Sequence, residues 1–251
     1  MAELLTVQAL VALLTLTILE IVLGVDNIIF LAIVTADVPK AQQNFVRKLG
    51  LGLALVGRIL MVLGLSWLLG LDKALFTLVG HGFSAKDLIL LAGGLFLTYK
   101  AVTEIFKVTE LKEDDAGAEK PAKVSAGTMA GVVLQIMVVD MVFAIDSVLT
   151  AVGLTQEYVL IIIAMTIAVL VMMFFAGSLA DFIHKHPSLK MLALAFLVLV
   201  GVLLIADGFG EEIERNYVYF AILFSLAVEA LNFRRQANEL RKKRLLESPG
   251  V

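Results

Sequence analysis

The chain contains no cysteine, so disulfide bonds, thiolate metal sites and cysteine-based catalysis are excluded. Charge is scarce as well: only 17% of the 251 residues are Asp, Glu, Lys or Arg, and the formal net charge is -3. Such a chain has no basic field of the kind that nucleic-acid binding needs, which excludes nucleic acid as a partner. The phosphate-binding motif GxxxxGK followed by Ser or Thr is also missing, which argues against transport driven by nucleotide hydrolysis within this chain.

The chain has three histidines, His81, His184 and His186, and all three fall in segments that we predict to be loops. No histidine is therefore expected inside a membrane span, where a bound metal would have to use oxygen ligands. The N-terminal sequence MAELLTVQAL lacks the positively charged region of a signal peptide, and the apolar stretch that it opens is far longer than a signal peptide needs. We expect this stretch to be a retained helix.

Hydrophobic residues, by contrast, make up 60% of the chain, and the mean hydropathy of +0.97 is typical of an integral membrane protein. A helical apolar run of about 17 residues or more can cross a hydrocarbon core of roughly 30 Å. We therefore expect an all-α polytopic membrane protein with seven transmembrane helices. The predicted spans lie near residues 4–34, 49–71, 87–106, 126–153, 158–180, 189–206 and 216–232.

The positions of Lys and Arg predict how the chain is oriented, because cytoplasmic loops carry an excess of both residues. With the N-terminus outside, the internal loops and the tail hold 16 of the 20 Lys and Arg residues. The external loops hold only Lys73, Lys86 and Arg215, and Arg58 lies within a span. The predicted orientation is N-out and C-in.

A polar segment, KVTELKEDDAGAEKPAKVS at 107–125, divides the chain into two halves and is predicted to be a cytoplasmic linker. We expect a single transmembrane domain over residues 1–235 and a basic cytoplasmic tail over residues 236–251. Within the domain we expect repeat A at about 4–106, repeat B at about 126–206 and a seventh helix at about 216–232.

The two halves share a motif. ILEIVLGVDNIIFLAIV, which begins at residue 18, aligns without a gap on VVDMVFAIDSVLTAVGL, which begins at residue 138. The polar residues pair at a constant offset of 120 residues: Glu20 with Asp140, Asp26 with Asp146, and Asn27 with Ser147. Each half has three spans, an odd number, so the second half must be inserted upside down relative to the first. The sequence therefore predicts an inverted repeat of three helices plus a seventh helix, with ion sites near the membrane midplane.

Four carboxylates thus lie inside the predicted spans, in two matched places. An ionised carboxylate near the bilayer centre costs about 2.5 kcal/mol or more, so it must face the protein interior, be protonated or be neutralised by a cation. A divalent cation would serve all four groups, and the oxygen donors of Glu, Asp, Asn and Ser suit Mg, Ca and Mn. A thioether of Met137 or Met141 beside Asp140 would favour the softer Mn, although methionine also fills gaps in a helical core.

Helical geometry separates the two carboxylates of one motif. Glu20 and Asp26 differ by about 240° around an ideal helix and by about 9 Å along its axis, so an unbroken helix cannot bring both to one ion. Gly24 lies between them and permits local unwinding, which would free backbone carbonyl groups as ligands. The second motif has Ala144 at the equivalent position, so a break there has less motivation.

Two further polar residues within the spans leave alternatives open. Arg58 in LALVGRILMVL either pairs with one of the carboxylates as a structural counter-ion or contacts the substrate, and we expect the pairing. Glu229, with Asn232 one turn on, is either an additional ligand or a side chain that reaches the inner interface. Arg58, Glu229 and Met141 are therefore accessory candidates for the site.

With these motifs the chain resembles the TerC family of bacterial integral membrane proteins, in its short form without CBS domains. The resemblance rests on the seven predicted spans and on the segments LEIVLGVDNIIFLAIV, QIMVVDMVFAIDSVLTAVGL and HPSLKMLALAFLVLVG. The resemblance covers about residues 8–235. It implies the handling of divalent metals, notably manganese export, and a metal site on the acidic motifs. The implied site residues are Glu20, Asp26, Asn27, Asp140, Asp146 and Ser147.

The leading hypothesis is a multi-pass secondary transporter of the bacterial cytoplasmic (inner) membrane that exports manganese. Calcium and magnesium are the other candidate substrates, and no organic cofactor is expected. TerC proteins are also linked to tellurite and stress resistance, so the alternative is a membrane scaffold that holds a structural metal ion. Such a scaffold would bind copies of itself or other membrane proteins.

The basic tail RRQANELRKKR would bind a partner in a scaffold, or would only anchor the last helix against anionic membrane lipid. An intramembrane aspartyl protease is the enzyme with the most similar chemistry, since it uses a pair of carboxylates. The sequences GVDN and AIDS lack the glycine that directly precedes the aspartate in the GxGD type. We therefore expect no enzymatic activity.

Overall fold

The computed structural model of the protein describes residues 6–65, 69–78, 80–110, 126–155, 157–211, 213 and 215–247. Within these ranges the chain is almost entirely helical, as the sequence predicts. The α-helices are α1 (Val7–Leu23), α2 (Val25–Val34), α3 (Lys40–Leu63), α5 (Ala85–Thr109), α6 (Ala126–Leu154), α7 (Tyr158–Lys185), α8 (Pro187–Gly208) and α9 (Arg215–Glu247). The other described elements are a β-hairpin and two short 3-10 helices, η2 (Thr35–Asp37) and η3 (Leu69–Asp72).

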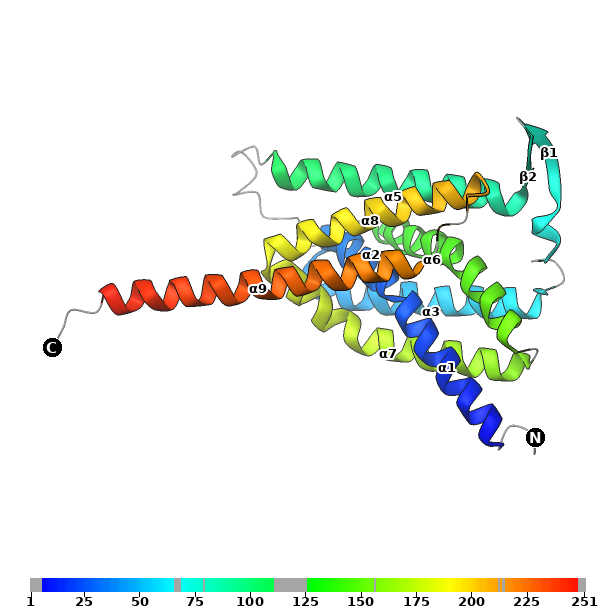
Figure 1. The fold of residues 1–251 in the computed structure, drawn as a ribbon, viewed down its shortest axis with the longest axis horizontal. Helices are drawn as coiled ribbons and strands as arrows, with labels where there is room; N and C mark the ends of the chain where they lie inside the picture. Colours follow the sequence, from blue (N-terminus) through cyan, green and yellow to red (C-terminus); the bar gives the residue numbers. More distant parts are fainter. Residues whose placement is uncertain are drawn as a thin grey trace.

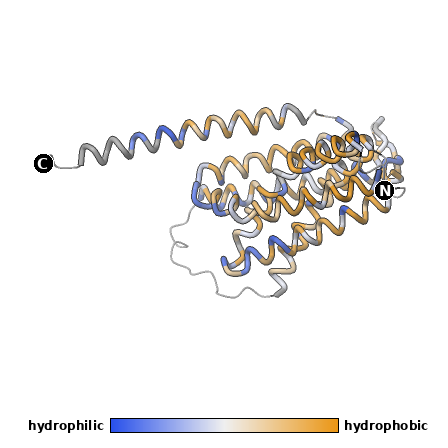
Figure 2. The backbone as a smooth tube through the Cα atoms, turned by 90° about the horizontal axis from the view of Figure 1, so that it is seen from below, coloured by the Kyte–Doolittle hydropathy of each residue, from blue (hydrophilic) through white to orange (hydrophobic). Residues whose placement is uncertain are grey.

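Five helical segments within the described residues are long and apolar enough to cross a membrane. They are Val7–Val34, which joins α1 and α2, Ala85–Thr109, Gly127–Leu154, Tyr158–Lys185 and Pro187–Gly208. Figure 2 shows their hydrophobic runs along the bundle, with hydrophilic segments near the helix ends. The predicted second and seventh spans, on α3 and α9, stay predictions, and residues 66–68 of the second span lie outside the described residues.

Two helices run into segments predicted to be linker and tail. α5 continues to Thr109 and so enters the predicted linker, of which residues 111–125 lie outside the described residues. α9 continues to Glu247, through most of the predicted tail, and its second half projects beyond the bundle (Figure 1). The reason is that hydropathy marks where a helix leaves lipid, whereas its backbone hydrogen bonds can continue into water.

A β-hairpin joins η3 to α5. β1 (Ala74–Leu78) pairs antiparallel with β2 (His81–Ser84), and Gly80 in the turn has a positive φ of 84°, a conformation that favours glycine. Phe83 stacks on Phe76 with ring centroids 5.4 Å apart and meets Phe209 edge-on at 6.0 Å. These ring contacts hold the hairpin against the end of α8.

The predicted loop positions of two histidines are wrong. His81 lies in β2, because aromatic packing stabilises a hairpin in a segment that has no hydropathy signal for one. His184 lies in the last turn of α7, which extends beyond its apolar stretch. Only His186 lies in a connection, between α7 and α8, where Pro187 opens α8.

α5 and α8 lie side by side (Figure 1), and glycine lets their backbones approach closely. A Cβ atom added at Gly94 would lie 2.6 Å from the carbonyl oxygen of Gly201. One added at Gly208 would lie 2.9 Å from the carbonyl oxygen of Asp87. A side chain at either position would therefore push the two helices apart.

We expect Gly94→Ala to lower the free energy of unfolding in detergent by about 1–3 kcal/mol, because the added methyl group overpacks this contact. Gly131→Ala in α6 is the matched control, since no atom lies within 4 Å of its Cβ position. There the exchange should stabilise the protein by up to about 1 kcal/mol, because alanine favours a helix more than glycine does. Equal shifts of the unfolding midpoint in both variants would contradict the close approach of α5 and α8.

The remaining helices of the bundle surround a shared core. α3 packs against both α6 and α7, and α1 and α2 pack against α7. The core is mainly aliphatic, with Phe30, Leu31, Met165 and Leu194 among its fully buried side chains. Several polar and charged side chains are also buried, and four of them, Glu20, Asn27, Arg58 and Asp140, are connected by hydrogen bonds.

Candidate functional site

Three charged side chains meet inside the bundle. Glu20 lies on α1, Arg58 on α3 and Asp140 on α6, and their exposed fractions are 1%, 2% and 5%. Arg58 Nη1 donates to Glu20 Oε2 at 2.7 Å, while Nη2 and Nε donate to Asp140 Oδ1 at 2.7 Å and Oδ2 at 2.8 Å. The prediction that Arg58 pairs with one of the carboxylates is confirmed, and the structure adds a second partner.

Asn27 joins these residues from α2, and the four side chains of Glu20, Asn27, Arg58 and Asp140 are called the charge cluster below. Asn27 Nδ2 donates to Asp140 Oδ1 at 3.0 Å. Ser147 is also buried, and its hydroxyl lies close to the Glu20 carboxylate. Residues of the first motif therefore contact residues of the second motif directly.

The charge cluster holds two carboxylates and one guanidinium, a formal surplus of one negative charge. Burying ions is costly, and their mutual attraction offsets that cost only when further hydrogen bonds satisfy the remaining polar atoms. Asp140 meets this condition, because both of its oxygens accept hydrogen bonds from Arg58 and one also accepts from Asn27. Glu20 does not, since Arg58 reaches only one of its oxygens.

Two buried oxygens of the charge cluster, Glu20 Oε1 and Asn27 Oδ1, have no hydrogen-bond donor at ordinary distance among the described residues. The Thr17 hydroxyl, one turn before Glu20, is likewise buried without a described partner. Buried polar atoms in proteins are nearly always satisfied by protein groups, water or ions. Carboxylate and amide oxygens are ligands that hard divalent cations accept, so this side of the charge cluster can take a cation.

Asp26 lies directly before Asn27 in α2, and Asp146 lies directly before Ser147 in α6. Their side chains are outside the described residues, so their role as ligands stays a prediction. Among the described side chains, no group of three or more His, Asp or Glu residues is placed to hold a metal ion. A metal site here would need Asp26, Asp146 or neutral oxygen ligands in addition to the described carboxylates.

Gly24 separates α1 from α2, but the local unwinding that would free backbone carbonyl groups as ligands is not observed, because the Gly24 carbonyl still accepts from the Ile28 N–H at 3.2 Å. The boundary is a single residue with φ -88° and ψ -3°, and the Gly24 N–H still donates to the Glu20 carbonyl at 2.9 Å. A Cβ atom at this position would lie 2.5 Å from the sulfur of Met172, which explains the need for glycine. α6 continues through Ala144 without a break. The two motifs therefore differ in backbone as well as in sequence.

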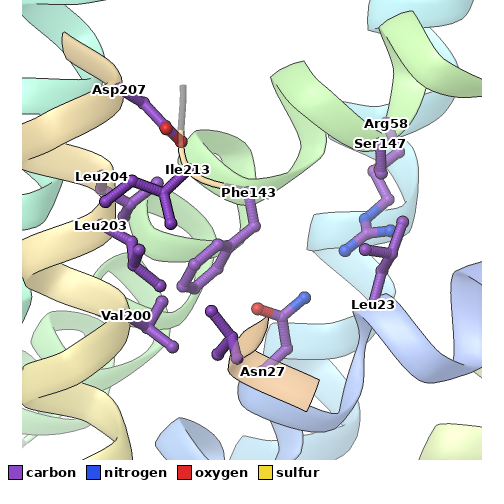
Figure 3. A pocket seen from close by; sticks show the side chains of 11 residues that line it. Leu23, Asn27, Arg58, Phe143, Ser147, Val200, Leu203, Leu204, Asp207 and Ile213 are labelled. Carbon is purple, nitrogen blue, oxygen red and sulfur yellow. The ribbon is translucent and has the colours of Figure 1, made fainter. Parts of the chain in front are cut away.

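A cavity of about 30 Å³ lies beside the charge cluster. Its polar lining comes from Asn27, Arg58, Ser147 and Asp207, and its apolar lining includes Phe143. Figure 3 shows Asp207 on the opposite side of the cavity from Arg58 and Ser147. One water needs roughly 10–15 Å³ of such space, so a water molecule or a small cation with little of its hydration shell fits.

Asp207 is the lining residue that the sequence analysis misses. It follows the predicted end of the sixth span at residue 206 by one position and belongs to neither copy of the repeated motif. In the sequence Asp207 is only an acidic residue at the end of an apolar run. Acidic residues are common at membrane interfaces, so this position does not indicate a site residue. Only the packing of α8 shows that its carboxylate shares a cavity with Asn27 and Arg58.

Comparison with known proteins agrees with the acidic motifs. A sequence profile described as "Integral membrane protein TerC family" matches residues 5–244. The chain belongs to the TerC family. The resemblance inferred from the two motifs is therefore confirmed.

Relatives of this TerC family protein occur in several bacteria. Inner membrane protein YgdQ of Escherichia coli (strain K12) is 48% identical over 228 residues, which are 91% of this chain and 94% of YgdQ. A protein of Haemophilus influenzae is 47% identical over 227 residues, 90% of this chain and 94% of the relative. Inner membrane protein YoaE of Escherichia coli (strain K12) is 40% identical over 234 residues, 93% of this chain but 44% of YoaE. No solved structure matches the chain.

This TerC family protein is a multi-pass protein of the inner membrane. Its family is one of integral membrane proteins, close relatives are named inner membrane proteins, and five of its helical segments are apolar enough to span. The predicted localisation is confirmed.

Two accessory candidates lie apart from the charge cluster of the TerC family protein. Met141 is 42% exposed on α6, so its thioether does not face the buried carboxylates. Glu229 on α9 is buried, and its Oε2 accepts a hydrogen bond from Asn232 Nδ2 at 3.2 Å. Neither residue is among the described side chains that line the cavity beside the charge cluster.

Proposed function

We propose that this TerC family protein exports a divalent cation across the inner membrane, with manganese as the first candidate and calcium or magnesium as the others. The observation that carries the proposal is the contact between the two acidic motifs, in which Arg58 joins Glu20 to Asp140. Equivalent residues of inverted repeats meet at the repeat interface, where secondary transporters hold their substrates. Glu20 and Asp140 form such an equivalent pair.

The proposed architecture has seven spans, an inverted repeat of three helices plus a seventh, and an N-out/C-in orientation. The helix packing supports the repeat. α3, the second span of repeat A, packs against α6, the first span of repeat B. The equivalent contact joins α7 to α1 and α2, and the third spans, α5 and α8, pack against each other. The contact of α3 with α6 thus corresponds to that of α7 with α1 and α2, and the contact of α5 with α8 corresponds to itself, as expected for a two-fold axis in the membrane plane.

Arg58 has a specific part in this proposal, because it holds the carboxylates when no cation is bound. An empty site of ionised carboxylates in the membrane interior would be costly, and the guanidinium lowers that cost. An arriving divalent cation has to compete with Arg58 for Glu20 and Asp140. This competition keeps the affinity moderate, and transport requires a substrate to leave its site as well as to bind it.

The remaining residues take roles by position. Asp26 would serve as the ligand nearer the inner side and Asp146 as the ligand nearer the outer side, with Asn27 and Ser147 as neutral donors. Asp207 would extend the path at the far end of the cavity. The ion is substrate in this proposal, and no organic cofactor or enzymatic step is needed.

The alternative is a membrane scaffold of a tellurite- or stress-resistance complex, in which the charge cluster holds a structural ion. One observation favours it: the buried hydrogen bonds of Arg58 and Asn27 join α1, α2, α3 and α6 in one arrangement, and they leave Glu20 Oε1 and Asn27 Oδ1 to a structural ion. A scaffold would bind another copy of this chain or other membrane proteins. It would not carry an ion across the membrane, so flux separates the two functions.

Manganese flux through proteoliposomes tests the proposal. We expect the wild-type protein to move Mn²⁺ down an imposed gradient. The Glu20→Gln variant should be slower by about 100-fold, because changing even a group that only supports a metal ligand costs about 10–100-fold in metal affinity or activity. Glu104→Gln is the matched control, since Glu104 is also buried but pairs with Lys190 at 3.0 Å on other helices.

The control variant should transport at nearly the wild-type rate. Absence of flux in the wild-type protein, together with a metal ion retained through purification and detected by elemental analysis, would contradict export and support the scaffold. Equal loss of flux in Glu20→Gln and Glu104→Gln would contradict the placement of the ion path at the charge cluster.

A further inference from the structure

A second and larger pocket lies at the end of the bundle where α3 begins and α7 ends. Its charged lining is mostly basic and consists of Lys40, Arg47, Asp181, His184, Lys185 and Lys190. None of these residues lines the cavity beside the charge cluster. The pocket is therefore separate from the proposed ion site.

Positive charge exceeds negative charge in this basic pocket. Lys190 is paired with Glu104 at 3.0 Å, and Asp181 interacts with Arg47. Lys40 and Lys185 are exposed and make no ion pair with a described side chain. A cation approaching here would be repelled, so the pocket suits an anion rather than a metal ion.

Arg47 lines the basic pocket, and hydrogen bonds hold its guanidinium group in place. Its side chain is buried, and its Nε donates to Thr35 Oγ1 at 2.9 Å while its Nη2 donates to Gln43 Oε1 at 3.0 Å. Gln43 is itself held, because its Nε2 donates to the Val38 carbonyl at 2.8 Å. Both acceptors of Arg47 are uncharged, so they orient the guanidinium without neutralising it. A pre-oriented guanidinium is well suited to phosphate.

The basic pocket continues into a groove between α3 and α7. Pocket and groove share Asn44, Gly177 and Asp181. The groove adds Lys48 and an apolar wall formed by Leu170, Met173 and Phe174. Leu170 and Phe174 are 57% and 79% exposed, which places apolar surface directly beside the charged pocket.

We propose that the basic pocket and this groove bind an anionic glycerophospholipid. The phosphate lies among Lys40, Arg47 and Lys185, and an acyl chain follows Leu170 and Phe174 along α7. Basic pockets between helices at a membrane face are suited to anionic lipid headgroups. A soluble phosphate would use the cations but leave the apolar wall unused, whereas a lipid uses both.

Native mass spectrometry of the purified full chain, with equimolar dioleoyl phosphatidylglycerol and dioleoyl phosphatidylethanolamine, tests the proposal. We expect the wild-type protein to retain phosphatidylglycerol preferentially. A Lys40→Gln/Lys185→Gln variant should bind it about 30-fold more weakly, because two lysines near an anionic headgroup are removed. The matched control is Lys73→Gln/Lys86→Gln, the same charge change beside the β-hairpin and outside both the pocket and the groove, and it should bind as the wild type does.

Three outcomes would overturn the proposal. One is equal retention of the two lipids by the wild-type protein, and another is unchanged binding in the Lys40→Gln/Lys185→Gln variant. The third is displacement of the lipid by glycerol 1-phosphate or inorganic phosphate, which would assign the pocket to a soluble phosphate. If the double variant does not fold, Lys40→Gln alone, at the exposed first residue of α3, gives the same comparison with a smaller expected loss.

Discussion

An Arg58→Leu variant should lose about 3–5 kcal/mol of unfolding free energy, because breaking a buried ion pair leaves uncompensated charge behind. Arg58 donates hydrogen bonds to both Glu20 and Asp140, at 2.7 to 2.8 Å. All three side chains are buried, so water cannot readily replace the lost donors. The substitution would leave two carboxylates near each other in the membrane interior. Unfolding midpoints in a single detergent would measure the loss.

Arg235→Leu provides the matched control on α9. Arg235 pairs with Glu239 at 3.6 Å in an exposed position, and such pairs contribute at most about 1 kcal/mol. A rescue adds Glu20→Gln and Asp140→Asn to Arg58→Leu, which removes the uncompensated charge and should recover part of the stability. Similar losses in Arg58→Leu and Arg235→Leu, or no recovery in the triple variant, would mean that the charge cluster does not stabilise the fold.

Asp26→Asn and Asp146→Asn should each lower manganese flux by about 100-fold, because changing a group that only supports a metal ligand already costs about 10–100-fold in affinity or activity. The two losses should be similar in size. The two aspartates are equivalent in the proposed inverted repeat, and a carrier that alternates between the two sides needs both. The measurement is initial Mn²⁺ flux at matched protein insertion. Asp72→Asn is the control, because Asp72 is exposed and pairs with Lys86 at 3.5 Å.

Unequal losses in the two variants would contradict the mirror relation between the motifs and indicate that one motif alone holds the ion. Unchanged flux in both variants would remove these aspartates from the ion path. A loss of equal size in Asp72→Asn would indicate a general effect of charge on the reconstituted protein rather than a ligand role.

Several features of this protein follow from local sequence. The long apolar runs predict helices, and five of the helical segments are long and apolar enough to span a membrane. The repeated motif identifies the TerC family and selects Glu20, Asn27 and Asp140. In the structure Arg58 links Glu20 to Asp140, and Asn27 donates directly to Asp140. The glycine in the first motif marks the boundary between α1 and α2, although the helical hydrogen bonds continue through it. Each of these features depends on residues that are near one another in the chain.

The hairpin, the helix ends beyond the lipid and the position of Asp207 could not be predicted in this way. The hairpin depends on ring contacts between Phe83 and Phe209, which are far apart in the sequence. α9 continues well beyond its apolar stretch, where hydropathy no longer indicates a helix. Asp207 has no equivalent residue in the other half of the chain. It is a candidate site residue only because it lines the cavity beside the charge cluster.

Hydropathy and motif spacing can be read along the chain, so the sequence alone was enough for the helical membrane class, the family and the residues of the charge cluster. The packing of the helices was needed to show that one guanidinium joins two carboxylates, that Asp207 lines a cavity with Arg58 and Asn27, and that basic residues of α3, α7 and α8 form one pocket. These contacts depend on the rotation and separation of packed helices. The rotation and separation of two helices are set by the volumes of the side chains on both sides of their interface and not by either helix alone. The close approach of Gly94 and Gly201 is an example.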